Sequence, residues 1–365
     1  ITINNPINTA GITSVTLGTS NFVAGVNAGN SITSGGNYNT TIGDEAGTAI
    51  TTGDNNVAVG YNSLTANTTG TDSVAIGHSA LLAQTTGGDN VAIGHLAMSS
   101  LTTAGNNTAV GDRAMQANTS GENNVAIGTL ALDANTTGAS NTAVGRDSLT
   151  ANTTGTQNTA VGKSALAANT TAGQNTAMGR EALFANTTGA DNTAIGAAAL
   201  YSNTTASSNT AVGRSCLINN TTGAENVAVG AESLDANTTG VQNNAIGYLS
   251  LTSCTTGSYN VAMGVAALND TTTGESNVAL GHLSSYSNLT GSSNTAVGQK
   301  SFYTNTTGTS NVVVGKSAMY YNTTGAGNTA VGVNALTANT TASNNTAVGT
   351  DALKANTTGS LNVAV

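Results

Sequence analysis

Three histidines and two cysteines are the residues of this chain best suited to metal or nucleophilic chemistry. His78 and His95 stand 17 residues apart, and His282 falls at the same place in the pattern described below. Two stacked imidazoles could hold a metal ion only if a third ligand joined them, and the preferred interpretation is that they are solvent-facing residues on a variable corner. Cys216 and Cys254 are expected to be free thiols. With no nucleophile–base pair either, the sequence predicts no catalysis, no cofactor and no metal site.

Aromatic side chains recur at the same 17-residue spacing. Phe184 and Tyr201 form one pair, and Tyr286, Tyr303 and Tyr320 form a run of three. If these rings point outward, they predict an adhesive surface for a protein or a glycan, because aromatic residues dominate binding hot spots. The alternative is that the rings stabilise the fold by stacking on one another, or lie at a contact between chains.

The tripeptide Asn-Xaa-Thr also recurs, and it matches the acceptor motif for N-linked glycosylation. The candidate glycosylation sites are Asn67, Asn135, Asn152, Asn169, Asn186 and Asn203. Regular threonines facing solvent would suit an ice-binding surface. However, adjacent residues of an extended strand face opposite sides, and Thr-Thr before glycine is more typical of a turn.

A strict repeat must position all of these residues. One glycine recurs from Gly43 to Gly349, a span of 306 residues or 18 steps of 17, without an insertion. A fixed short period is the signature of a solenoid, in which each coil contacts only its neighbours. The sequence therefore predicts an all-β fold, a parallel β-solenoid (β-roll) with 17 residues per coil.

Positions in each coil are numbered from this glycine as zero. Positions −3 to −1 are predicted to form a strand. Position −1 is apolar, −2 is nearly always alanine, and −3 is mostly valine or threonine. Period-two alternation puts −1 in the core and −2 outside. Leucine at +4 is also predicted to be buried, within a second short strand. Positions −2 and +3 are small, which predicts that they face outward against another chain.

Asparagine is nearly constant at −4 and frequent at +7. Asparagine tolerates turn conformations, and identical asparagines stacked in register form amide ladders. The pattern thus predicts two such ladders along the solenoid. Acidic residues collect beside the turns, at +2 and at +11 or +12, where they are expected to be solvated.

Composition excludes several classes of function. Charged residues make up 7% of the chain and aromatic residues 3%, and the net charge is −9. An acidic chain lacks the basic face that nucleic acid requires. The sequence contains no run of 18 apolar residues, so it predicts no membrane span. The fixed register of apolar residues argues against disorder, despite the low charge.

The repeat divides the chain in two. Residues 1–36 are irregular and are expected to form an N-terminal cap or junction, whereas residues 37–365 form the solenoid. The last coil, up to Val365, is as regular as an interior one and is not followed by a capping repeat. This predicts either that the natural protein continues or that solenoids stack end to end into a filament.

The strand motif resembles that of a known family. Asn-Asn-Val-Ala-Ile-Gly at 123–128 and Asp-Ser-Val-Ala-Ile-Gly at 72–77 resemble the head repeat of trimeric autotransporter adhesins, the YadA-type head. The Asn-Thr-Thr-Gly turn resembles related repeats of tail-fibre-like proteins. The resemblance covers about residues 37–365. It implies a left-handed β-roll, a homotrimer and adhesion, on the cell surface or as a virion surface fibre.

The expected function is an extracellular structural or adhesive fibre shaft or adhesin head, acting as a homotrimer on a host-surface protein or glycan. The first alternative is a single-chain β-solenoid that binds ice or glycan through its stacked threonine or tyrosine rows. The second is a subunit of a filament that stacks end to end.

Overall fold

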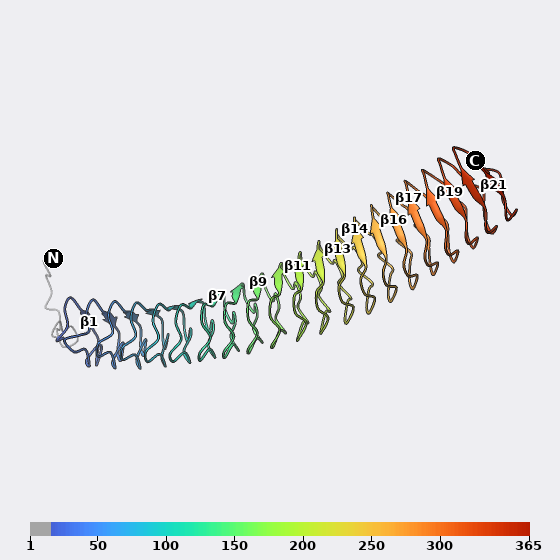
Figure 1. Cartoon of the computed structure of the whole chain (residues 1–365). Coiled ribbons are helices and arrows are strands. Elements are labelled where there is room, and N and C mark those ends of the chain that lie inside the picture. Colours follow the sequence, from blue (N-terminus) through green and yellow to red (C-terminus); the bar gives the residue numbers. More distant parts are fainter. Residues whose placement is uncertain (1–15) are drawn as a thin grey trace. The chain divides into compact units, whose positions relative to one another are not determined.

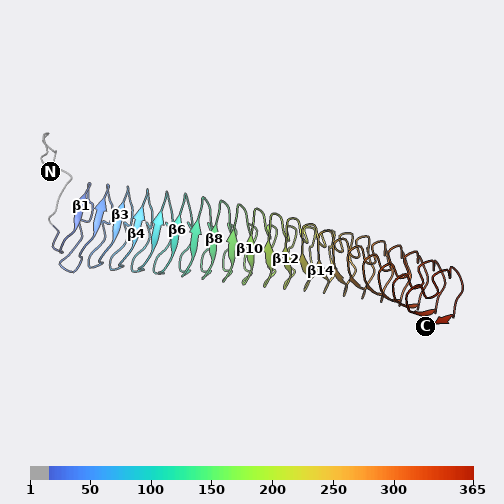
Figure 2. The ribbon, with the colours of Figure 1, turned by 90° about the horizontal axis from the view of Figure 1, so that it is seen from above.

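The computed structural model describes residues 16–365, which form strands and turns but no helix. The chain divides into two compact units, Ile1–Asn175 and Thr176–Val365. In each unit, short strands from successive coils pair in parallel and lie one behind the other (Figure 1, Figure 2). The predicted all-β parallel β-solenoid with about 17 residues per coil is therefore confirmed.

Each coil contributes one strand, at positions −3 to −1. The first unit holds β1 (Phe22–Ala24), β2 (Thr40–Ile42), β3 (Val57–Val59), β4 (Val74–Ile76), β5 (Val91–Ile93), β6 (Thr108–Val110), β7 (Val125–Ile127), β8 (Thr142–Val144) and β9 (Thr159–Val161). The second unit holds β10 (Thr176–Met178), β11 (Thr193–Ile195), β12 (Thr210–Val212), β13 (Val227–Val229), β14 (Asn244–Ile246), β15 (Val261–Met263), β16 (Val278–Leu280), β17 (Thr295–Val297), β18 (Val312–Val314), β19 (Thr329–Val331), β20 (Thr346–Val348) and β21 (Val363–Ala364).

The solenoid starts earlier than the sequence predicts. Strand β1 pairs in parallel with β2, with Phe22 opposite Thr40 and Ala24 opposite Ile42. This coil has 18 residues instead of 17, which is why Gly25 falls one residue out of the later register. The expected boundary at residue 36 is therefore wrong for the described part of the segment, and residues 1–15 lie outside the described residues.

The second strand predicted around +4 is wrong, because positions +1 to +6 form turns. Residues at +2 and +4 adopt positive φ, for example 56° at Glu232 and 54° at Leu234. The amide of Glu232 donates to Arg214 O in the preceding coil (3.0 Å), whereas the amide of Leu234 donates to Ser250 O in the following coil (3.0 Å). This turn thus bonds to both neighbouring coils, although leucine normally avoids left-handed conformations.

The predicted core faces are correct at +4 and wrong at three other positions. Leu132 (+4) is fully buried as expected, but so are Ala131 (+3) and Ala126 (−2). Ile127 (−1), predicted to be inside, is 42% exposed. The left-handed residue at +4 breaks the alternation, so +3 and +4 both face inward. The alanines are small because they fill a narrow coil interior, and not because another chain packs on them.

The two predicted amide ladders are confirmed, and they close the coil. Asn124 (−4) donates from its side chain to Asn107 Oδ1 of the preceding coil at 3.3 Å, and Asn135 (+7) does so to Asn118 Oδ1 at 2.9 Å. Both amides also donate to one carbonyl, Gly138 O, at 2.9 and 3.0 Å. These buried amides therefore have partners within their own coil and in the preceding one, as buried polar groups require.

One coil departs from the asparagine pattern and compensates within itself. Ser73 replaces asparagine at −4, and Gln84 replaces it at +7 of the same coil. The longer Gln84 amide donates to Ser73 Oγ (3.1 Å) and to Gly87 O (2.8 Å), and Asn90 of the following coil donates to Gln84 Oε1 (3.0 Å). The short Ser73 side chain and the long Gln84 side chain together keep the buried polar groups of this coil hydrogen-bonded.

A second departure leaves the ladder broken, at Cys254 (+7). Asn237 Oδ1 of the preceding coil and Thr271 Oγ1 of the following coil are buried without a partner. We expect Cys254→Asn to raise the free energy of unfolding by about 1–2 kcal/mol, because the new amide can donate to Asn237 Oδ1 and accept from Thr271. Urea unfolding followed by circular dichroism measures the change. Cys254→Ala is the control, since it supplies no amide; equal midpoints for the two variants would refute the ladder's contribution.

Candidate functional site

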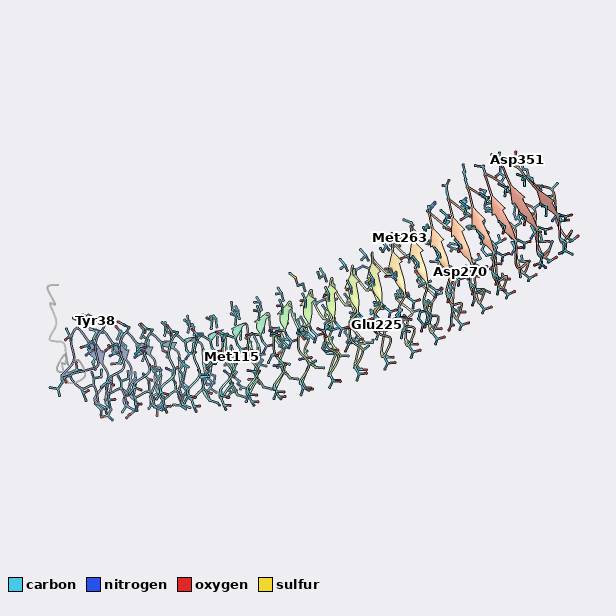
Figure 3. All side chains as sticks on the ribbon, in the orientation of Figure 1. Tyr38, Met115, Glu225, Met263, Asp270 and Asp351 are labelled. Carbon is cyan, nitrogen blue, oxygen red and sulfur yellow. The ribbon has the colours of Figure 1, made fainter. Side chains whose placement is uncertain are left out.

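The outward side of the strands carries a row of apolar side chains that the fold does not bury. We call residues −3 and −1 of all strands the outer strand face. Its −1 residues are apolar in every coil, and none of its residues carries a charge. In the first unit Ile76, Ile93 and Ile127 are 37%, 38% and 42% exposed. In the second unit Met178 and Met263 are 43% and 44% exposed, and Figure 3 labels Met263 beside its strand. A regular row of partly exposed apolar side chains of this kind is typical of an interaction site.

The predicted aromatic row is present, and its rings stack on one another. Phe184 and Tyr201 lie with ring centroids 5.0 Å apart and planes 8° apart. Tyr286–Tyr303 and Tyr303–Tyr320 are separated by 5.3 and 4.9 Å. All five side chains are half-buried. Their faces cover each other, so solvent meets mainly edges and hydroxyl groups. The arrangement favours the stacking interpretation over a flat platform for sugar rings.

Sequence reasoning missed the neighbours of this row. Tyr321 packs edge-on against Tyr320 at 4.7 Å, and Lys300 Nζ lies 6.0 Å from the Tyr303 ring centroid. Burial raises the pKa of Asp270, whose position is labelled in Figure 3, and a hydrogen bond with Ser287 opposes that shift. The charge of Asp270 raises the pKa of Tyr286, with burial as the second cause. The phenol at this end of the row is therefore held in its neutral form.

The two adjacent histidines belong to a longer row at +1. Tyr61 stacks on His78 at 5.5 Å, His78 lies 5.2 Å from His95, and His95 Nδ1 lies 2.8 Å from Asp112 Oδ1. The shared position at +1 was the signal that could have added Tyr61 and Asp112. Across residues 16–365, no group of three or more His, Cys, Asp or Glu residues is arranged to hold a metal ion.

The six candidate glycosylation sites are core residues. Asn67, Asn135, Asn152, Asn169, Asn186 and Asn203 are all fully buried at +7, within the second amide ladder. The Asn152 amide, for example, donates to Asn135 Oδ1 at 2.9 Å and to Gly155 O at 3.1 Å. A glycan on this nitrogen would break both bonds and open the coil, so the folded solenoid corrects this prediction.

Both cysteines are free, as predicted, and both are buried. Cys216 fills the alanine or serine slot at +3, and Cys254 fills the asparagine slot at +7. Burial raises the pKa of each thiol to about 12. Because the thiolate is the reactive form, neither is suited to nucleophilic or redox chemistry.

The two threonine rows differ. The +8 hydroxyls donate to the backbone of the next coil, as Thr238 Oγ1 does to Thr255 O at 3.0 Å. The +9 side chains are exposed in every coil from Thr52 to Thr358. Exposed ion pairs lie beside the +1 corner, with Arg146–Asp147 and Arg180–Glu181 each at 3.0 Å. Such pairs contribute roughly 0–1 kcal/mol.

Comparison with known proteins adds no assignment. The chain matches no protein-family model and no curated protein. Within residues 16–365, no helix has the length and apolar character needed to cross a membrane.

Proposed function

We propose that the chain is an extracellular structural or adhesive repeat protein that works as a homotrimer, with its outer strand face buried between chains. The exposed apolar −1 row carries this proposal. An isolated solenoid would leave an isoleucine, valine, leucine or methionine partly exposed in every coil, from Ile42 to Val161 in one unit and from Met178 to Val348 in the other. Burial of apolar area contributes about 25 cal/mol per Å², and the gain accumulates coil by coil.

A second copy of the chain fits this face better than an unrelated partner. The face repeats once per coil, at about the 4.8 Å separation of paired strands. A partner that covers many coils needs the same axial repeat, and an identical chain has it. The absence of charge on the face favours burial, because no ion has to be desolvated. Closed symmetric assemblies are also the usual form of self-association, and the resemblance to trimeric autotransporter adhesins favours three chains.

In this proposal, adhesion involves the exposed turn positions that remain outside such an assembly. Positions +1 and +12 are exposed and vary freely from coil to coil, as with His95, Asp112 and Thr129 at +1. A rigid shaft with a variable exposed row suits contact with a host-surface protein or glycan. The buried, unreactive cysteines and the absence of a nucleophile–base pair among the described residues favour binding over catalysis.

Sedimentation equilibrium of the purified chain tests the assembly. We expect a mass of three times 35.6 kDa at micromolar concentration. Ile93→Lys with Ile127→Lys should shift the mass toward one chain, since each change places a charge in the apolar face. His95→Lys with Thr129→Lys is the matched control, two residues away on the +1 corner of the same coils, and should leave the trimer intact. A monomeric parent chain would refute the proposal.

A further inference from the structure

Position +9 is exposed and yet almost invariant within this chain. Every coil from Thr188 to Thr358 in the second unit carries threonine there, and the first unit has one exception, Ser120. The other exposed positions have diverged: +1 holds Tyr248, Val265 and His282 in three successive coils. Substitutions between repeats have therefore accumulated at other exposed positions but not at +9. The residue type at +9 is thus under a constraint of its own.

Packing does not supply that constraint. At +8 the hydroxyl donates to the next coil, which explains threonine there. No +9 hydroxyl in residues 16–365 has a hydrogen-bond partner within the protein. The backbone amide at +9 does bond, as Thr239 N does to Thr255 O at 3.4 Å, but any residue except proline offers that amide.

The choice of threonine shows which groups are needed. Where only a β-branched side chain is needed, as at −3, valine and threonine exchange freely, for example Val278 and Thr295 in successive coils. Where only a small side chain is needed, as at +3, alanine and serine exchange. Position +9 never accepts valine and accepts serine once. It therefore retains a hydroxyl and a methyl group together.

We propose that the +9 threonine row of residues 176–365 binds ice. Liquid water would satisfy each hydroxyl separately and would require neither a fixed spacing nor a methyl group. An ice surface requires both, because hydroxyls replace lattice waters at regular intervals and methyl groups lie over the cages between them. The row supplies one threonine per coil at about 4.8 Å, close to a lattice repeat of ice. Backbone bonds at +8 and +9 to the next coil keep this spacing rigid.

The row is independent of the proposed assembly. Position +9 follows one strand by ten residues and precedes the next strand by five, so it is not part of the outer strand face, and burying that face does not require covering it. Attachment of O-linked sugars to the same hydroxyls is the competing explanation. It accounts less well for the pattern, because a serine hydroxyl is an equivalent acceptor and serine is nearly absent from the row.

Ice recrystallisation inhibition and thermal hysteresis of the whole chain test the proposal. The parent is expected to keep ice grains small at micromolar concentration and to shape single crystals. Thr273→Lys, Thr290→Lys and Thr307→Lys together should raise the concentration needed at least tenfold, because three successive lysines hold ice away from the row. Two further triple variants replace Thr273, Thr290 and Thr307 by valine in one case and by serine in the other. Both should weaken the ice activity, because each removes one of the two groups of threonine.

The matched control uses the same three coils and the same added charge. Ser276→Lys, Ser293→Lys and Ser310→Lys change the exposed +12 position and should leave ice activity unchanged. Circular dichroism confirms that both triple variants are folded. An inactive parent chain, or equal activity of the two triple variants, would overturn the proposal. Sedimentation of the same samples tests the trimer separately, so failure of one proposal is distinguishable from failure of the other.

Discussion

Replacing Leu166 by Asp is expected to lower the free energy of unfolding by roughly 4 kcal/mol or more. Leu166 occupies +4 and is fully buried, and it is the one large apolar side chain inside its coil. The substitution removes its packing, which alone costs about 2–5 kcal/mol, and buries a carboxylate without a cationic partner. Urea unfolding at neutral pH, followed by circular dichroism, measures the loss.

Two further measurements make this result specific. Lys163→Asp, at the exposed +1 position of the same coil, introduces the same carboxylate on the surface and should cost less than about 1 kcal/mol. Burial would raise the folded-state pKa of an aspartate at 166 above its unfolded value. Stability relative to the parent should therefore recover in part as the pH falls through that raised pKa. Similar midpoints for the two variants would show that the core is placed wrongly.

Gly128→Ala is expected to be the most damaging single methyl addition in the repeat. Gly128, at position zero, has φ of 136°, a conformation that L side chains rarely adopt. An added Cβ would lie 2.7 Å from the carbonyl carbon and oxygen of Gly145 in the next coil. Strain of this kind costs about 1–3 kcal/mol, and the backbone contact adds to it. Loss of stability by several kcal/mol should appear as a lower melting temperature.

Gly138→Ala, at +10 of the same coil, is the control. Its Cβ would also meet backbone, 2.4 Å from Gly155 O, but its φ is not positive. The chain itself carries alanine at this position in Ala104, Ala172, Ala206 and Ala342. We expect Gly138→Ala to cost about 1 kcal/mol or less. If it were the more harmful of the two, the positive φ would not explain why glycine at zero never varies.

Much of the fold could be predicted from the period alone. A strict 17-residue repeat with one β-branched segment per coil is compatible with few architectures, and stacked asparagines have few roles besides a ladder. The faces could not be predicted, because Leu132 and its equivalents adopt positive φ against their intrinsic preference. Alternation therefore fails between +3 and +4. Small alanines at −2 also suggested a contact between chains, whereas they fill a narrow interior.

The surfaces were less predictable than the fold. Spacing correctly brought Tyr286, Tyr303 and Tyr320 into one row, but it could not show that their rings cover one another. The Asn-Xaa-Thr motif predicted exposed acceptors, and the three-dimensional position of Asn135 in a buried ladder excludes this in the folded chain. A local motif carries no information on burial, which depends on the coils above and below.

Thiol labelling of single-cysteine variants tests most directly whether the outer strand face is an interface between chains. Cys216 and Cys254 are buried, with thiol pKa values raised to about 12, and should contribute no background. A thiol at Ile127→Cys should react with a maleimide at least tenfold more slowly than one at Thr129→Cys, on the exposed +1 corner. The two rates should become equal in urea. Equal rates in the native protein would contradict the buried strand face, and with it the proposed trimer.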